Sequence, residues 1–279
     1  MADNSAPVTK TSLRAARAAV VIVGGHEGGG RVAVDPLVEY GPLLCAASAG
    51  RQLDESLYQA LDSSDLPVCV VPMTLGRDPQ LVAGIARTLT VLSRGAAAGR
   101  VVLAESFGTA ALLTGWLRVA VAGAARRHGG TDLAMLVTAN AANRFDDAEL
   151  FRIARLVKVQ EGLPWVEVAF RGGDPDLAEG IDRCGRLGAR RVAVVPADFG
   201  AGTDAPMSGV TDTPMPSVID GGPLLSPSAI SGMLATRVAG ALLKLTRGDD
   251  GIAAGLDADH GHGHGGEPWR AKKKIWGVG

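Results

Sequence analysis

Aromatic residues and cysteines are scarce in this chain of 279 residues, and its charges nearly cancel. Aromatics make up 4% of the residues, so alanine, valine and leucine must fill the core that a 47% apolar content allows. The net charge of −1 lacks the basic excess of a nucleic-acid-binding surface, so we expect no nucleic-acid partner. Cys45, Cys69 and Cys184 form no CxxC pair and no disulfide framework, which suits a reducing cytosol.

Long hydrophobic runs are also missing. Residues 1–17 contain no continuous apolar stretch of the kind found in a signal peptide. The most apolar segment, TAALLTGWLRVAVAGAA, carries Arg118 and falls short of a clean membrane span. We therefore expect a buried amphipathic helix there, no membrane partner and a cytoplasmic protein.

Three common ligand-binding signatures are absent or incomplete. There is no P-loop, and in the loop GGHEGGGR a histidine occupies the second glycine of a GxGxxG fingerprint, so no nucleotide cofactor is expected. The nearest approach to a GxSxG nucleophile elbow is AESFG around Ser106, where Ala104 replaces the first glycine. Nucleotide and hydrolase chemistry therefore have little support.

Short apolar runs alternate with longer amphipathic stretches, a pattern that predicts an α/β fold with parallel sheets. The predicted strands are residues 19–25, 43–47, 68–73, 101–105, 133–139, 166–170, 192–197 and 216–220. The predicted helices are residues 54–61, 79–92, 109–127, 146–160, 175–188 and 228–245.

The two halves of the chain match at a shift of 124 residues. VCVVPMTLG (68–76) aligns with VAVVPADFG (192–200), and the preceding helical stretches agree at the same shift. Chance similarity between two valine-rich strands is the alternative. We predict two tandem α/β repeats, residues 18–127 and 131–246, that face a shared cleft. Residues 247–279 lack periodicity and are expected to form a flexible tail rich in glycine and histidine.

His26 stands at the end of the first predicted strand, inside the glycine-rich loop. Ligands of parallel sheets bind at this edge, and a histidine there suits a metal ligand or a proton acceptor. A histidine bonded within its own loop is the alternative. A second feature favours metal, because His260, His262 and His264 alternate with glycine in the tail. Such a tract fits metal capture, although a solvated low-complexity tail would also explain it.

The segment PWVEVAFRGGDPDLAEGIDRCGRLGARRVAVVPADFGAGTD (164–204) resembles the class II tetrapyrrole chelatases. More narrowly, it is similar to the long, two-repeat sirohydrochlorin chelatases, which insert cobalt, iron or nickel. Members have a Gly-His-Gly loop after an apolar strand and a second histidine eight residues after a Val-Pro strand end. His26 in VGGHEGG matches the first histidine. The corresponding later positions offer Asp78 and Asp204, and the second repeat has Asn140 near the counterpart of His26.

The resemblance implies a lyase that inserts a divalent metal ion into a sirohydrochlorin-type tetrapyrrole, with both as substrates. It places the metal on His26, with the carboxylates of Asp78 and Asp204 as further ligands and the tail histidines as a store. His26 would accept pyrrole protons, and Glu27 or Asp78 would relay them or hold the metal first. The carboxylates of the tetrapyrrole would bind cationic side chains and free backbone N–H groups. The residues predicted for that task are Gly28, Gly29, Gly30, Arg31, Arg77 and Arg171.

Two other functions stay open at this point. A degenerate chelatase fold would bind metal or tetrapyrrole without turnover, for example as the partner of another subunit. An unrelated α/β enzyme would use the glycine-rich loop to bind a phosphate.

Overall fold

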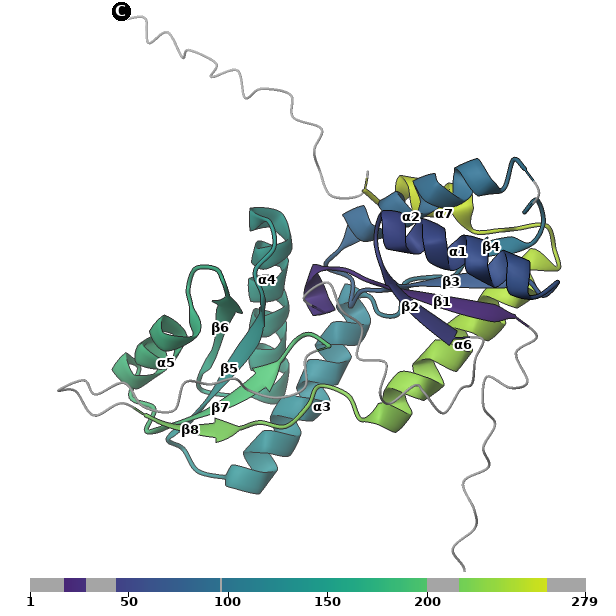
Figure 1. Cartoon of the computed structure of the whole chain (residues 1–279). Coiled ribbons are helices and arrows are strands. Elements are labelled where there is room, and N and C mark those ends of the chain that lie inside the picture. The colour runs from purple at the N-terminus through teal and green to yellow at the C-terminus, as the bar shows by residue number, and fades with distance from the viewer. Residues whose placement is uncertain (1–17, 29–43, 96, 200–215, 260–279) are drawn as a thin grey trace, which may run out of the picture.

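The computed structural model describes residues 18–28, 44–95, 97–199 and 216–259. In this part of the chain two parallel four-stranded sheets alternate with helices (Figure 1). The first half contains β1 (Ala19–Gly24), η2 (His26–Gly28), β2 (Leu44–Ser48), α1 (Arg51–Ser63), β3 (Val68–Met73), α2 (Pro79–Leu92), β4 (Val101–Leu103) and α3 (Ala110–His128). The second half contains β5 (Leu133–Asn140), α4 (Arg144–Glu161), β6 (Val166–Arg171), α5 (Leu177–Arg186), β7 (Arg191–Pro196), β8 (Ser217–Asp220), α6 (Pro227–Leu245), α7 (Ile252–Leu256) and η4 (Asp257–Asp259).

The two sheets have the same strand order, which confirms the predicted tandem α/β repeats. The first sheet runs β2-β1-β3-β4 and the second runs β6-β5-β7-β8, with parallel pairing throughout. The central strands β1, β3, β5 and β7 are almost completely buried, as expected for continuous apolar runs between covered faces.

Helix α3 of the first half and helix α6 of the second half each pack on the sheet of the other half. Helix α3 contacts β5, β7 and α4, whereas α6 contacts β3 and β4 (Figure 1). Hydrogen bonds hold this exchange, because Glu105 after β4 accepts from Arg237 and Lys244 of α6 at 2.8 and 2.7 Å. On the other side, Arg127 of α3 donates to the Gly221 carbonyl at 2.6 Å. The predicted sequence repeats therefore differ from the two halves seen in space.

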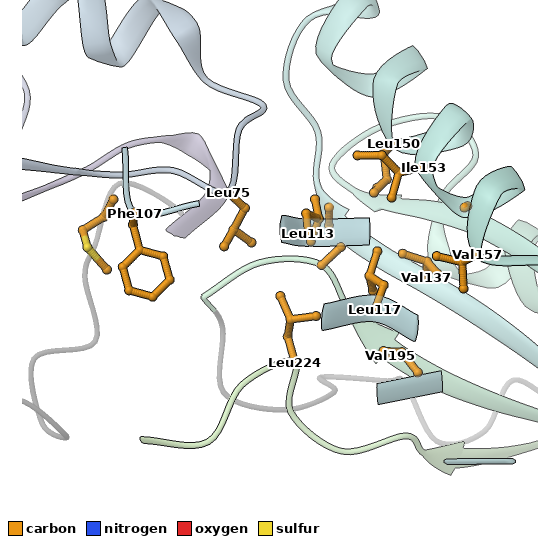
Figure 2. Packing of buried hydrophobic residues seen from close by; sticks show 14 of the residues in the cluster. Leu75, Phe107, Leu113, Leu117, Val137, Leu150, Ile153, Val157, Val195 and Leu224 are labelled. Carbon is orange, nitrogen blue, oxygen red and sulfur yellow. The ribbon is translucent and has the colours of Figure 1, made fainter. Parts of the chain in front are cut away.

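One continuous hydrophobic core follows from this exchange. Figure 2 shows Leu75 and Phe107 from the first half joined through Leu113 and Leu117 of α3 to Val195 of the second sheet. Separate, smaller clusters lie on the outer faces of the two sheets, under α1, α2 and α7 and under α5. The apolar segment that contains Arg118 is helix α3, and no helix in the described ranges is long and apolar enough to cross a bilayer.

Residues 247–259, which were predicted to belong to a flexible tail, are folded, and the rest of the predicted tail lies outside the described residues. Residues Ile252–Leu256 and Asp257–Asp259 form α7 and η4, and both pack on α2. Gly255 of α7 allows this close approach, since a Cβ there would lie 2.3 Å from Leu103 Cδ2. The Leu103 N–H also donates to the Asp250 carbonyl at 2.8 Å. This segment therefore covers the edge strand β4 and belongs to the folded body.

Candidate metal site at the junction of the two repeats

His26 lies at the carboxyl end of β1, in the short turn η2. The turn closes where the Gly28 N–H donates to the Gly25 carbonyl at 3.1 Å. Because β1 is central in its sheet, it ends beside the carboxyl ends of β2 and β3. The sequence placed His26 at this ligand-binding edge, and the structure has it there.

Asp78 holds His26 in place through two contacts. Its Oδ2 lies 2.9 Å from Nδ1 of His26 and accepts the His26 backbone N–H at 3.3 Å. Its Oδ1 accepts the Leu81 N–H at 2.9 Å, so Asp78 is also the N-cap of α2. A Cβ at position 25 would lie 2.2 Å from Asp78 Oδ2, which explains the glycine there. The helix cap therefore fixes the carboxylate, and the carboxylate fixes the imidazole.

This contact leaves the other imidazole nitrogen of His26 available. Nε2 is buried and has no hydrogen-bond partner among the described residues. Burial lowers the pKa of His26, but the hydrogen bond with Asp78 and its negative charge outweigh burial and raise it. Burial likewise opposes ionisation of Asp78, yet the bond with His26 lowers the pKa of that carboxyl. Metal-binding histidines commonly have this arrangement, with one nitrogen on a carboxylate and the other on the metal.

Glu27 is completely buried, which differs from the predicted proton relay facing a substrate. Its Oε2 accepts the Thr74 hydroxyl and, at 2.8 Å, the Leu75 N–H. Burial raises the pKa of this carboxyl, and the positive charge of Arg77 opposes that rise. Glu27 therefore ties the His26 turn to the loop after β3.

Several contacts join the His26 turn to the second repeat. The Asn140 side chain donates to the His26 carbonyl at 3.0 Å, and the Phe199 N–H donates to the Glu27 carbonyl at 3.2 Å. Asn140 ends β5 and Phe199 follows β7, and these strands are the equivalents of β1 and β3. The carboxyl ends of the two sheets therefore meet at His26.

Arg77 was predicted to bind substrate carboxylates, but its side chain has no exposed surface. Its Nε donates to the Asp146 carbonyl at 3.3 Å, and its Nη2 lies 3.6 Å from Asp147 Oδ1. Both acids belong to the first turn of α4 in the second repeat. In this structure Arg77 spans the junction and cannot meet a ligand from solvent.

The second repeat has no histidine at the position equivalent to His26. Val23 pairs with Pro72 in the first sheet and Thr138 pairs with Pro196 in the second, so strand register aligns His26 with Ala141. Asn140 is the equivalent of Gly25.

Asn140 accepts a hydrogen bond from Arg171 Nε at 3.0 Å, and Arg171 is paired with Asp198. Arg171, another predicted substrate-binding residue, keeps about a third of its side chain exposed (35%). It lies at the carboxyl end of β6, on the second-repeat side of the junction.

Three residues of the junction were not predicted from the sequence: Thr74, Asp146 and Asp147. The sequence feature that could have pointed to these acids follows β5, where α4 begins with an asparagine N-cap and two acidic residues in its first turn. That pattern predicts a helix start and does not reveal its contact with Arg77.

The remaining predicted site residues lie outside the described ranges. They are Gly29, Gly30, Arg31, Asp204, His260, His262 and His264. Gly28 is described and closes the η2 turn. Within the described ranges, no group of three or more histidine, cysteine or acidic side chains is arranged to hold a metal ion.

The fold is similar to that of the solved structure of SirB. SirB from Bacillus subtilis, solved with Fe3+, superposes with a TM-score of 0.52 at 14% identity, covering 84% of this chain and 98% of SirB. SirB from Bacillus subtilis subspecies spizizenii, in complex with cobalt, gives a TM-score of 0.48 at 12% identity over 84% of this chain and 97% of its own.

A multi-domain protein from Deinococcus radiodurans, described as structurally similar to chelatases, gives a TM-score of 0.42 at 18% identity. That match covers 81% of this chain and 54% of the other. No family model and no curated protein matches the sequence. The chain thus has two parallel-sheet repeats and a fold similar to that of SirB, at low sequence identity.

Proposed function

We propose that this protein inserts a divalent metal ion into a sirohydrochlorin-type tetrapyrrole, with Nε2 of His26 as the nitrogen that meets the metal. The observation that carries the proposal is the buried Nε2 without a partner, opposite an Nδ1 held by Asp78 at 2.9 Å. The shared fold with SirB supports the reaction class. Cobalt, iron and nickel are the candidate metals, since imidazole suits the later divalent ions.

Each residue of the site has a task in this scheme. Asp78 orients the imidazole and stabilises its positive form when His26 takes up a proton. The macrocycle must release two pyrrole N–H protons as the metal enters. Once the ion has left Nε2 for the macrocycle, that nitrogen would accept one of them, and the other would pass to water. Arg171 at the end of β6 is a cation for the substrate carboxylates. Because Nε2 is buried, binding of the macrocycle requires the contacts between the repeats to separate.

The second candidate is a carrier that binds metal or tetrapyrrole without turnover. The alignment of His26 with Ala141 favours it, because the second repeat lacks the matching ligand. A chelatase and a carrier both bind metal or tetrapyrrole, but only a chelatase increases the rate of metal insertion. A kinetic assay therefore separates them.

The test follows absorbance of sirohydrochlorin with cobalt(II) and the full-length protein. The parent should form the metallated macrocycle faster than the protein-free mixture, and His26→Ala should return the rate to that baseline. His128→Ala is the matched control, because His128 is the other described histidine and ends α3. It should keep the parent rate.

Other outcomes assign other functions. Binding of metal or tetrapyrrole without acceleration identifies a carrier. A thermal shift with phosphate compounds, and none with tetrapyrrole, identifies the phosphate-binding enzyme.

A further inference from the structure

Arg77 is a buried charged residue whose guanidinium has few hydrogen-bond partners. Its side chain has no exposed surface, and Nη1 and Nη2 have no hydrogen-bond partner among the described residues. Its one hydrogen bond, from Nε to the Asp146 carbonyl, is long at 3.3 Å, and the approach to Asp147 at 3.6 Å exceeds hydrogen-bond distance. A buried guanidinium with unpaired N–H groups is costly, so its retention calls for a physical reason.

The charge of Arg77 belongs to the same buried region as His26. Asp78 follows it directly in the chain and contacts His26. The neighbouring loop residues Thr74 and Leu75 bind Glu27. The positive charge of Arg77 also lowers the pKa values of His26, Glu27 and Asp146 relative to a site without it. Arg77 is therefore the internal cation of an otherwise acidic junction.

A metal ion on Nε2 of His26 would be a second cation in this region. Like charges repel strongly where water is excluded, and the loop that carries Arg77 leaves it little room to move away. Gly76 has φ of +100°, and a Cβ there would lie 2.4 Å from the Ala110 backbone nitrogen. The loop is thus fixed against the start of α3.

We propose that Arg77 keeps the affinity of the His26 site for divalent metal low, so that the ion passes on to the acceptor macrocycle. This inference rests on the proposed role of His26 as a metal ligand. Arg77 is a positioning residue that acts through its charge on the metal site. A delivery protein needs a site that captures the ion but yields it to a stronger chelator, and a fixed internal cation provides that balance.

The test compares dissociation constants for cobalt(II) in the full-length chain. Every variant carries His260→Asn, His262→Asn and His264→Asn, so that the tail does not bind the metal. Arg77→Met should bind cobalt at least about tenfold more tightly, ~1.4 kcal/mol. Removal of the fixed cation removes its repulsion of a divalent ion in the same water-poor region, which is the source of the expected gain. Transfer of cobalt from this variant to a chromogenic chelator should be correspondingly slower.

Three further variants separate charge from structure. Arg77→Lys keeps the charge and should bind within about twofold of the parent. Asp147→Asn loosens the same contact between the repeats but leaves Arg77 charged, so it should bind no more tightly than the parent. Arg191→Met removes an arginine paired with Asp132 at the start of β7, at the opposite edge of the sheet, and should leave the affinity unchanged.

The outcomes are distinct. Parent-like or weaker binding by Arg77→Met overturns the inference, as does equal tightening by Arg77→Lys or Asp147→Asn. If Arg77→Met fails to fold, Arg77→Gln, which can still donate to the Asp146 carbonyl, carries the same expectation. If His26→Ala binds cobalt as tightly as the parent, the metal is elsewhere and the proposed function fails. If only the Arg77 variants behave as the parent does, the proposed function stands and this inference alone is lost.

Discussion

Replacing Gly25 by alanine should disable the His26 site while leaving the fold intact. The new Cβ would lie 2.2 Å from Asp78 Oδ2 and 2.9 Å from Leu81 Cδ2. The leucine methyl can rotate, but the carboxylate is held by the Leu81 N–H at 2.9 Å as the cap of α2. To reach an ordinary contact of 3.4 Å, Oδ2 must move by 1.2 Å (3.4 minus 2.2). That shift breaks its contact with Nδ1 of His26.

The size of the effect follows from the role of Asp78. Loss of a carboxylate that orients a metal-binding histidine reduces metal affinity by about 10- to 100-fold. Overpacking and partial loss of the cap should lower the free energy of unfolding by about 1–3 kcal/mol. The φ angle of Gly25 is not in the left-handed region, so alanine adds no backbone strain. The loss in affinity is therefore expected with a folded protein.

Isothermal titration with cobalt(II), in the chain with substituted tail histidines, measures this effect, and thermal melts report folding. Gly28→Ala is the matched control in the same turn, because a Cβ there meets nothing within 4 Å. It should keep the parent metal affinity. Parent-like affinity in a folded Gly25→Ala variant would refute the orienting role of Asp78, and an equal loss in both variants would point to the turn as a whole.

Three further predictions concern stability. Leu117→Ala should lower the free energy of unfolding in denaturant titrations by about 2–5 kcal/mol, because Leu117 is fully buried between the repeats. Val119→Ala, 70% exposed on the same helix, should change it by less than about 0.5 kcal/mol. The hydrogen bond from Lys244 lowers the pKa of the Glu105 carboxyl, so the stabilisation from this pair is present above the ordinary value of 4.5 and is lost as the pH falls through the lower pKa of the folded state. The difference in unfolding free energy between the parent and Glu105→Gln should therefore disappear in acid. A difference that persists in acid would exclude this pair as its cause. Residues 18–128 and 129–259 expressed separately should be poorly folded and should form a heterodimer on co-expression, whereas two independently folded monomers in size-exclusion chromatography would contradict the helix exchange.

The secondary structure was largely readable from the sequence, because buried parallel strands and amphipathic helices have distinct periods. The predicted helix 79–92 coincides with α2, and the predicted strand 68–73 coincides with β3. The duplicated pattern at a shift of 124 residues corresponds to the equivalent strands β3 and β7. The spacing of polar and apolar residues within one segment is enough to predict a helix or a strand, so no contact with another segment has to be known.

The exchange of α3 and α6 was not predictable in the same way. Leu113, Leu117 and Val121 mark one buried face of α3, but nothing in that pattern states which sheet the face covers. Side-chain hydrogen bonds such as that from Lys244 to Glu105 help to select the sheet that α6 covers, and these two residues lie 139 positions apart in the chain. The short helix α7 was missed for a related reason, since its small residues gain stability only from packing against α2 and β4.

The site shows the same limit at the scale of single residues. The sequence singled out His26 and Asp78 but treated Asp78 as a metal ligand, whereas the structure has its carboxylate on Nδ1 and on the cap of α2. Glu27 and Arg77 stood in loops that looked exposed, and both are buried. Their partners come from other strands and from the second repeat, so spacing along the chain did not indicate them.

The two repeats have the same strand order, yet they contribute different residues to the candidate site. The first repeat supplies the imidazole and its orienting carboxylate. The second supplies Asn140 on the His26 carbonyl and the first turn of α4 against Arg77. The imidazole is held at Nδ1 by Asp78 and the backbone carbonyl of His26 is held by Asn140, so the ring has a defined direction without a histidine at Ala141. If His26 binds metal as proposed, the absence of a histidine at Ala141 leaves one protein ligand fewer, and a site with fewer ligands would release its ion more readily to a macrocycle.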